Sequence, residues 1–169
     1  DFRNFFSPNK QKSKFNSNST FITALDLISA QFNAKEIKII KDIENIELYG
    51  YENELIQAFI NILNNSRDEL IKLENDKKRL IFIDGHISEK HVTIEIKDSA
   101  GGVPEDIIDK VFEPYFTTKH QGQGTGIGLY MTQEIIEKHL NGTITVQNTT
   151  YEYANETYTG ALFTIELNI

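Results

Sequence analysis

One predicted helix carries an unusual set of amide side chains between Gln57 and Asp68. Asparagine is a poor helix former, yet three asparagines stand here among strongly apolar residues. Gln57, Asn61 and Asn65 are spaced four residues apart and a carboxylate follows three residues later, so these side chains share one helix face. Their oxygen atoms suit a hard cation such as Mg²⁺. A solvated helix face in an asparagine-rich chain is the alternative.

A carboxylate, Asp98, ends the strand predicted over residues 91–98, and Gly101 and Gly102 follow shortly after it. Because glycine has no side chain, a ligand can approach the backbone closely at such a place. The run therefore indicates a binding loop. A plain turn from strand to loop is the alternative.

A second glycine-rich run, over residues 122–129, leads into a predicted helix. Free N–H groups and the positive end of the helix dipole make such a place suitable for phosphate. No Gly-Lys-Ser/Thr follows, so the run is not a Walker A loop, and Leu129 stands where a dinucleotide fingerprint needs its third glycine. The spacing predicts phosphate binding by another family of folds, with a flexible hinge as the alternative.

Aromatic residues lie between the two glycine-rich runs, in the segment 112–119. In a loop, such rings can cover an apolar base, and Lys119 can reach a phosphate. Aromatic side chains more often pack in the core. This segment alone does not decide between the two.

Hydrophobic periodicity predicts the elements that position these residues. Helical patterns cover residues 20–32, 52–73 and 126–140, and strand patterns cover 36–49 (two short strands), 79–87, 91–98, 143–149 and 158–168. A long, mostly irregular stretch such as residues 99–125 is usually either functional or disordered. The prediction is a two-layer α/β sandwich with helices on one face of a mixed, largely antiparallel sheet.

Composition limits the class of protein. A chain of 169 residues fits one domain of ordinary size or two very small ones, and it is long enough to need no disulfides or structural metal to fold. The absence of cysteine excludes thiol catalysis, cysteine-based zinc sites and iron–sulfur clusters. A net charge of −8 argues against binding of nucleic acid. No apolar run reaches the length of a membrane span and no signal peptide opens the chain, so we expect a soluble domain of the cytoplasmic kind.

The first nineteen residues differ from the rest. Residues 1–8 are amphipathic and end at a proline, which predicts the end of an upstream helix, with a frayed N-terminus as the alternative. Residues 9–19 are polar and read as a linker. The folded domain is expected over residues 20–169.

The four segments stand in an order that resembles the catalytic ATP-binding domain of sensor histidine kinases, over residues 20–169. That superfamily also holds DNA gyrase, the heat-shock chaperone ATPases and the mismatch-repair ATPases. Residues 57–68 resemble its N box, 98–104 its first glycine box, 112–116 its F box and 124–129 its second glycine box. The resemblance implies a Bergerat-type fold in which residues 105–124 form a long lid over ATP.

The resemblance also implies a role for each matched residue. Asn65 would hold Mg²⁺ against the triphosphate, with Asn61 as its partner in catalysis. Asp98 would accept a hydrogen bond from the adenine amino group, and Thr164, on the last strand, matches a polar residue near the adenine. The implied nucleotide contacts are Asn61, Asn65, Asp68, Asp98, Gly102, Val103, Phe116, Lys119, Gly124, Thr125, Gly126, Ile127, Gly128, Leu129 and Thr164.

The implied activity is transfer of the γ-phosphoryl group of MgATP to a histidine on an upstream dimerisation domain, and onward to a response-regulator receiver domain. No histidine precedes His86, so the acceptor is expected outside this chain. We expect this chain to be monomeric and the full-length protein to be a homodimer, either soluble or membrane-anchored. Ala100 replaces the first glycine of the Asp-x-Gly-x-Gly pattern. We expect ATP binding to tolerate this replacement if residue 100 needs no positive φ.

Two other functions are weighed against kinase activity. ATP-hydrolysing relatives such as gyrase place a glutamate one helical turn before the Mg²⁺-binding asparagine, where it activates water. Asn61 occupies that position here and cannot act as a base. The third function is a regulatory module that binds nucleotide without transferring phosphate.

Overall fold

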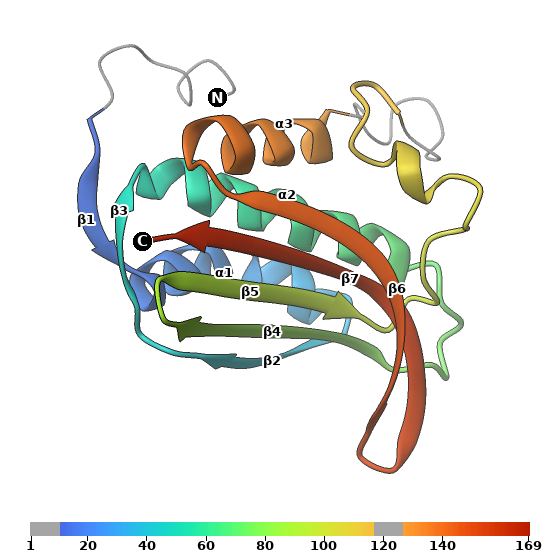
Figure 1. The fold of residues 1–169 in the computed structure, drawn as a ribbon. Coiled ribbons are helices and arrows are strands. Elements are labelled where there is room, and N and C mark those ends of the chain that lie inside the picture. The colour runs from blue at the N-terminus through green and yellow to red at the C-terminus, as the bar shows by residue number, and fades with distance from the viewer. Residues whose placement is uncertain (1–10, 117–126) are drawn as a thin grey trace.

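Five strands form the main sheet, in the order β2 (Ile37–Ile43), β4 (Arg79–Ser88), β5 (His91–Asp98), β7 (Glu156–Asn168) and β6 (Thr143–Tyr153) (Figure 1). This computed structural model describes residues 11–116 and 127–169. In it, β2 runs parallel to β4, and the other neighbouring pairs are antiparallel. The mixed, largely antiparallel sheet predicted from the sequence is therefore confirmed.

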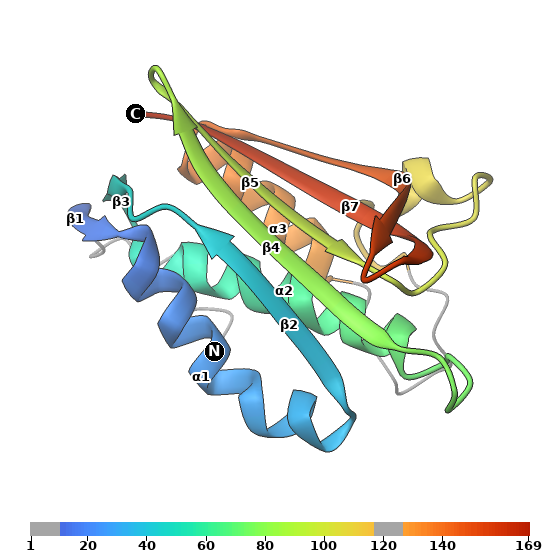
Figure 2. The ribbon, with the colours of Figure 1, turned by 90° about the horizontal axis from the view of Figure 1, so that it is seen from below.

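The helices pack against one face of this sheet (Figure 2). They are α1 (Ser17–Ala34), α2 (Glu52–Leu70), and α3 (Gly128–Glu134) with its π-helical continuation η3 (Ile135–His139). A short 3₁₀ turn, η2 (Ile108–Lys110), lies in the loop between β5 and α3 and buries none of its residues. A separate pair of strands consists of β1 (Ser13–Asn16) and β3 (Glu47–Gly50). The predicted two-layer sandwich is confirmed. Within the described ranges, no helix is long and apolar enough to cross a membrane.

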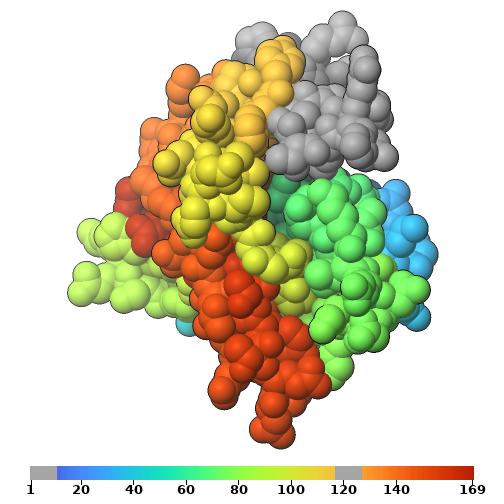
Figure 3. Space-filling model, turned by 90° about the vertical axis from the view of Figure 1, so that its right-hand side faces the viewer, coloured from blue at the N-terminus to red at the C-terminus, as the bar shows by residue number. Residues whose placement is uncertain are grey.

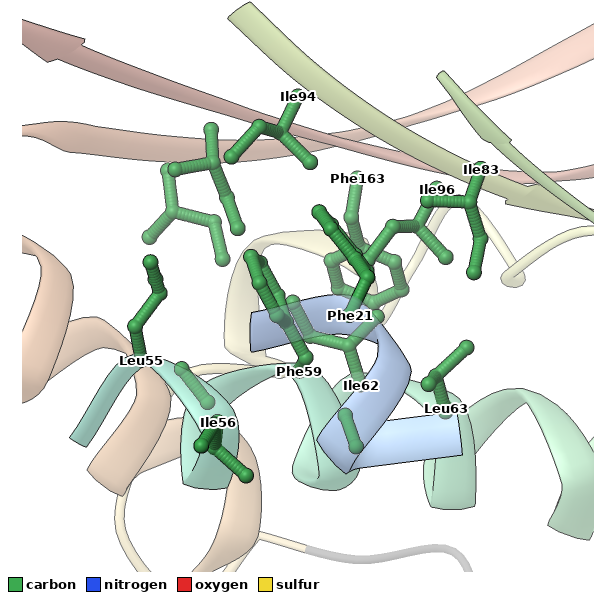
Figure 4. Close-up of a cluster of buried hydrophobic side chains, with 14 of the residues drawn as sticks. Phe21, Leu55, Ile56, Phe59, Ile62, Leu63, Ile83, Ile94, Ile96 and Phe163 are labelled. Atoms are coloured by element: carbon green, nitrogen blue, oxygen red, sulfur yellow. The ribbon is translucent and has the colours of Figure 1, made fainter. Parts of the chain in front are cut away.

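The core lies between the helices and the sheet (Figure 4). Ile94 and Ile96 of β5 are buried in it and alternate with more exposed residues. On the helical side, Phe59 of α2 stacks on Phe21 of α1, with ring centroids 4.1 Å apart. Because side chains alternate along a strand, Asp98 points to the same face as the two isoleucines. The sheet therefore aims this carboxylate at the helices.

The N-terminal part of the fold differs from the linker predicted over residues 9–19. The strand β1 pairs antiparallel with β3, and α1 begins at Ser17. The buried Ser17 hydroxyl donates to the carbonyl of Glu44 at 2.8 Å and accepts from the N–H of Ile46 at 2.8 Å. Strand pairing and this hydroxyl order a stretch whose composition alone reads as a linker. The helix end predicted over residues 1–8 lies outside the described residues.

The hairpin of β6 and β7 extends beyond the strands predicted over residues 143–149 and 158–168. The two strands stay paired up to a turn of two residues, Ala154 and Asn155. These residues have φ of 51° and 67°, and positive values at both positions are what a type I′ turn requires. The tight turn lets the hairpin project past the end of the sheet (Figure 1).

Ser17 provides a test of where the folded domain begins. In Ser17→Ala the carbonyl of Glu44 and the N–H of Ile46 lose this partner, and leaving a buried group unpaired costs ~1–3 kcal/mol. We expect the free energy of unfolding, measured by urea denaturation, to fall by that amount. The control Ser29→Ala, on the exposed side of α1, should change it by less than about 0.5 kcal/mol. Equal effects would mean that the start of α1 does not belong to the cooperative unit.

Candidate functional site

Asp98 ends β5 with its carboxylate buried, since only 3% of the residue is exposed. Its Oδ1 atom accepts hydrogen bonds from the backbone N–H groups of Ala100 at 3.0 Å and Ala161 at 3.2 Å. Its other oxygen, Oδ2, receives no hydrogen bond of ordinary geometry from the described residues. The carboxylate is thus held in one orientation with acceptor capacity left for a ligand.

The pKa of the Asp98 carboxyl is raised, because burial disfavours its charged form. The N–H groups of Ala100 and Ala161 offset part of this effect. The hydroxyl of Ser66 on α2 also lowers the pKa, whereas Glu69 raises it. Ser66 is buried, although its hydroxyl makes no hydrogen bond of ordinary geometry with the described residues. A ligand that donates a hydrogen bond here would stabilise the charged form.

Asn61 joins α2 to the start of α3. Its Nδ2 donates to the carbonyl of Gly128 at 3.1 Å, and its Oδ1 accepts from Gln57 at 2.7 Å. Thr132 donates to the same Gly128 carbonyl at 3.0 Å. Both ends of the Asn61 side chain are therefore engaged, and the residue positions α3 relative to α2.

Asn65 lies one turn further along the same face of α2 and is half-buried. In the part of the chain that the structure describes, no hydrogen bond engages its side-chain amide. Asp68, which follows on that face, forms an ion pair with Arg67 at 2.8 Å. Among the predicted polar residues of α2, Asn65 is therefore the one best able to take a ligand.

The loop that follows β5 is pinned at Val103. Gly101 and Gly102 have φ of 101° and 91°, whereas Ala100 has no positive φ, so the alanine in the glycine-box pattern causes no strain. The N–H and the carbonyl of Val103 both bind the side chain of Asn148 on β6, at 2.7 Å each. Asn148 cannot be recognised from the sequence, because nothing in the local pattern marks a contact that spans 45 residues.

The aromatic segment beyond this loop packs partly against the core. Phe112 meets Phe163 of β7 edge-on, with ring centroids 6.2 Å apart, and Phe116 is half-buried. Ile127 directly precedes α3, and Leu129 packs against the core. Four predicted nucleotide contacts lie outside the described residues: Lys119, Gly124, Thr125 and Gly126.

Thr164 does not face the Asp98 carboxylate. It stands between Phe163 and Ile165, which are both buried against the helices. Because side chains alternate along a strand, Thr164 points to the opposite face of the sheet. This position corrects the predicted contact between Thr164 and adenine. The contribution of β7 to the site is the backbone N–H of Ala161.

Known proteins resemble this chain in sequence and in fold. Residues 50–169 match the family described as "Histidine kinase-, DNA gyrase B-, and HSP90-like ATPase". Sporulation kinase E of Bacillus subtilis (strain 168) is 36% identical over 126 residues, which are 73% of this chain and 16% of that protein. Sensor histidine kinase ZraS of Escherichia coli (strain K12) is 30% identical over 148 residues, which are 86% of this chain and 29% of that protein.

A solved structure has the same fold. The crystal structure of histidine kinase ThkA in complex with response regulator protein TrrA matches with a TM-score of 0.69 and 20% identity, over 99% of this chain and 46% of that chain. This chain spans less than a third of the length of either curated relative. Since the family match covers residues 50–169, the chain belongs to the family of histidine kinase-, DNA gyrase B- and HSP90-like ATPases.

Proposed function

We propose that this chain is the catalytic domain of a sensor histidine kinase. It binds MgATP and transfers the γ-phosphoryl group to a histidine of an upstream dimerisation domain. The observation that carries the proposal is the Asp98 carboxylate, buried at the end of β5 and oriented by two backbone N–H groups. Membership of an ATPase family supports the use of ATP.

The Asp98 carboxylate gives the site a physical reason to prefer adenine. It can accept a hydrogen bond from the amino group of adenine, but it would face the carbonyl of guanine, acceptor against acceptor. A hydrogen bond to a charged group contributes ~1.5–3 kcal/mol, which corresponds to a preference for ATP over GTP of roughly tenfold to a hundredfold.

A magnesium ion fits this site through Asn65. Mg²⁺ usually takes only one or two protein oxygens and completes its shell with water and the phosphates of the substrate. Within the described residues, no group of three or more histidine, cysteine or acidic side chains could hold a metal alone. The amide of Asn65 can supply the single protein ligand that such a site needs. When bound, the ion neutralises charge on the triphosphate.

Positioning and charge stabilisation are the protein's part in phosphoryl transfer. Asn61 ties Gly128, at the start of α3, to α2, and Asn65 lies one turn further along α2. A glutamate at position 61 could activate water, but an asparagine cannot. This favours transfer to a side chain over hydrolysis.

We assign the acceptor histidine to a helical domain outside this chain. Of the described histidines, His86 and His91 lie on the strands of the β4–β5 hairpin, and His139 pairs with the buried Glu54 at 2.7 Å. The preceding domain would also form the dimer, this chain being monomeric by itself. The complex of ThkA with TrrA supports a response-regulator receiver domain as the next acceptor. ATP use and this partner favour a cytoplasmic location, whether the full-length protein is soluble or membrane-anchored.

Calorimetric titration with a slowly hydrolysed ATP analogue, with and without Mg²⁺, tests the nucleotide site. We expect Mg²⁺-assisted binding that is at least roughly tenfold tighter than binding of the GTP equivalent. Fused to a histidine-bearing dimerisation domain, the chain should then label that histidine from radioactive ATP. Binding without transfer would indicate a regulatory module, and release of free phosphate without labelling would indicate an ATPase.

Asn65→Ala should remove the Mg²⁺-dependent part of this binding. The loss of a ligand to the ion is expected to weaken binding of the ATP analogue in Mg²⁺ by about tenfold or more, as for other contacts to charged groups. The affinity measured in EDTA should stay the same. Asn33→Ala, at the exposed end of α1, is the matched control. An undiminished effect of Mg²⁺ in Asn65→Ala would remove the metal assignment.

Asp98→Asn should lower the selectivity for adenine and raise the stability of the fold. The new amide oxygen can still accept from Ala100 and Ala161, but its NH₂ group would face the adenine amino group, donor against donor. We expect the preference for ATP over GTP to fall about tenfold or more in the same titration. The free energy of unfolding at pH 7 should rise, because the buried charge is gone.

The pH dependence of the stability gained in Asp98→Asn tests whether the buried charge of Asp98 is its cause. The pKa of Asp98 is raised in the fold, so the native state binds this proton more tightly than the unfolded chain does. The free energy of unfolding of the wild type therefore falls as pH rises through the native pKa of Asp98. The difference in this free energy between Asp98→Asn and the wild type should shrink as pH falls toward 3.8, the ordinary pKa of an aspartate. Thermal melting across that pH range measures the difference. A difference that does not vary with pH would contradict this account.

A further inference from the structure

We propose that Asn148 and Tyr151 are positioning residues that set the preference for adenine, because β6 uses them to hold the two ends of the segment 98–103. This inference rests on the proposed function, in which Asp98 recognises the base. Neither residue needs to touch the ligand, since both act on the backbone that carries the carboxylate. Figure 3 shows the loop after β5, in yellow, lying against the orange-red strand β6.

Asn148 binds Val103 as a neighbouring strand would. Its Oδ1 accepts from the N–H and its Nδ2 donates to the carbonyl, each at 2.7 Å. The same Nδ2 donates to Oε1 of Glu105 at 3.1 Å. A Cβ atom at Gly102 would lie 2.8 Å from the Asn148 Oδ1. The glycine that was expected to admit the base is therefore also required to admit this asparagine.

Tyr151 holds the other end of the segment. Its hydroxyl donates to the backbone carbonyl of Asp98 at 2.7 Å. Its ring is fixed by Phe82, which meets it edge-on with centroids 5.4 Å apart, and by the ammonium of Lys97, 4.2 Å from the ring centre. Burial and the charge of Asp98 raise the pKa of Tyr151. The hydroxyl therefore stays protonated and remains a donor at neutral pH.

The two residues hold the segment from opposite faces of the sheet. Asn148 and Tyr151 are three residues apart on one strand, so their side chains point to opposite sides. On β7, a Cβ atom at Gly160 would overlap the Asp98 carbonyl, so the two backbones lie in close contact. The carbonyl and the carboxylate belong to one residue. Fixing the direction of the carbonyl therefore restricts the direction of the carboxylate.

Loss of the hydrogen bonds made by Asn148 or by Tyr151 should affect the contact to the base more than the contacts to the phosphates. A hydrogen bond weakens steeply as its angle departs from linearity, so a looser Asp98 would bind the adenine amino group less well. In the proposed function α2 contributes to binding the phosphates, and the hydrogen bonds of Asn148 and Tyr151 to the segment 98–103 do not involve α2. The GTP analogue has no such base contact to lose. Selectivity, rather than overall affinity, is therefore the quantity that should change.

Titration of Asn148→Ala and Tyr151→Phe with both nucleotide analogues tests the proposal. The matched controls are Gln147→Ala and Tyr158→Phe on the same hairpin. Gln147 is exposed, and the Tyr158 hydroxyl donates to Glu156 at 3.0 Å, away from the segment. We expect the ratio of ATP-analogue to GTP-analogue affinity to fall about three- to tenfold in each test variant, the value of one or two net hydrogen bonds. It should keep its wild-type value in the controls.

Other outcomes would overturn the proposal. An unchanged ratio in both test variants, with a lower melting temperature, would mean that the ties are only structural. Equal weakening of both analogues would mean a general loosening of the site. A wild-type chain without adenine preference would overturn the proposed function itself, and that result is obtained before any variant is made. Tyr151→Phe keeps its ring against Phe82 and Lys97, so the test does not depend on Asn148→Ala folding.

Discussion

A buried carboxylate at the end of a strand is the constraint on which the rest of this molecule depends. Burial penalises the charged form of Asp98, so the surrounding elements must supply donors and hold them in place. Strand β7 supplies the N–H of Ala161, and the loop after β5 supplies that of Ala100. Two side chains of β6 bind the backbone at Asp98 and at Val103. Keeping such a group lowers stability, as is common where a site serves function.

The helix α2 connects the Asp98 carboxylate to the amide side chains of Asn61 and Asn65. Ser66 lies on the side of α2 that faces Asp98, and the adjacent side carries Asn61 and Asn65. In the proposed function, one rigid helix thereby fixes the distance between the residues that contact the base and those that contact the phosphates. Because Asn61 also binds Gly128, the start of α3 is tied to the same helix.

The parts of the site that follow a local period could be predicted from the sequence. Helical spacing puts Asn65 on its face of α2, and alternation along β5 puts Asp98 against the helices. Contacts across the fold could not be predicted in this way. Ala161 acts through its backbone N–H, 63 residues from its acceptor, and no side-chain type marks it. Thr164 is polar and lies on the last strand, but the alternation of that strand turns it to the opposite face.

The two-residue turn of Ala154 and Asn155 affects the position of Tyr151 on β6. It sets the register of the hairpin, in which Tyr151 lies opposite Tyr158. A slip of one residue would turn every side chain of one strand to its other face, and the carbonyl of Asp98 would lose its donor. In the proposed arrangement, a turn at the projecting tip of the hairpin thus helps to decide which base is bound. A change in the length of this turn that shifted the register by one residue would therefore, in the proposed arrangement, alter ligand recognition rather than only the shape of a surface loop.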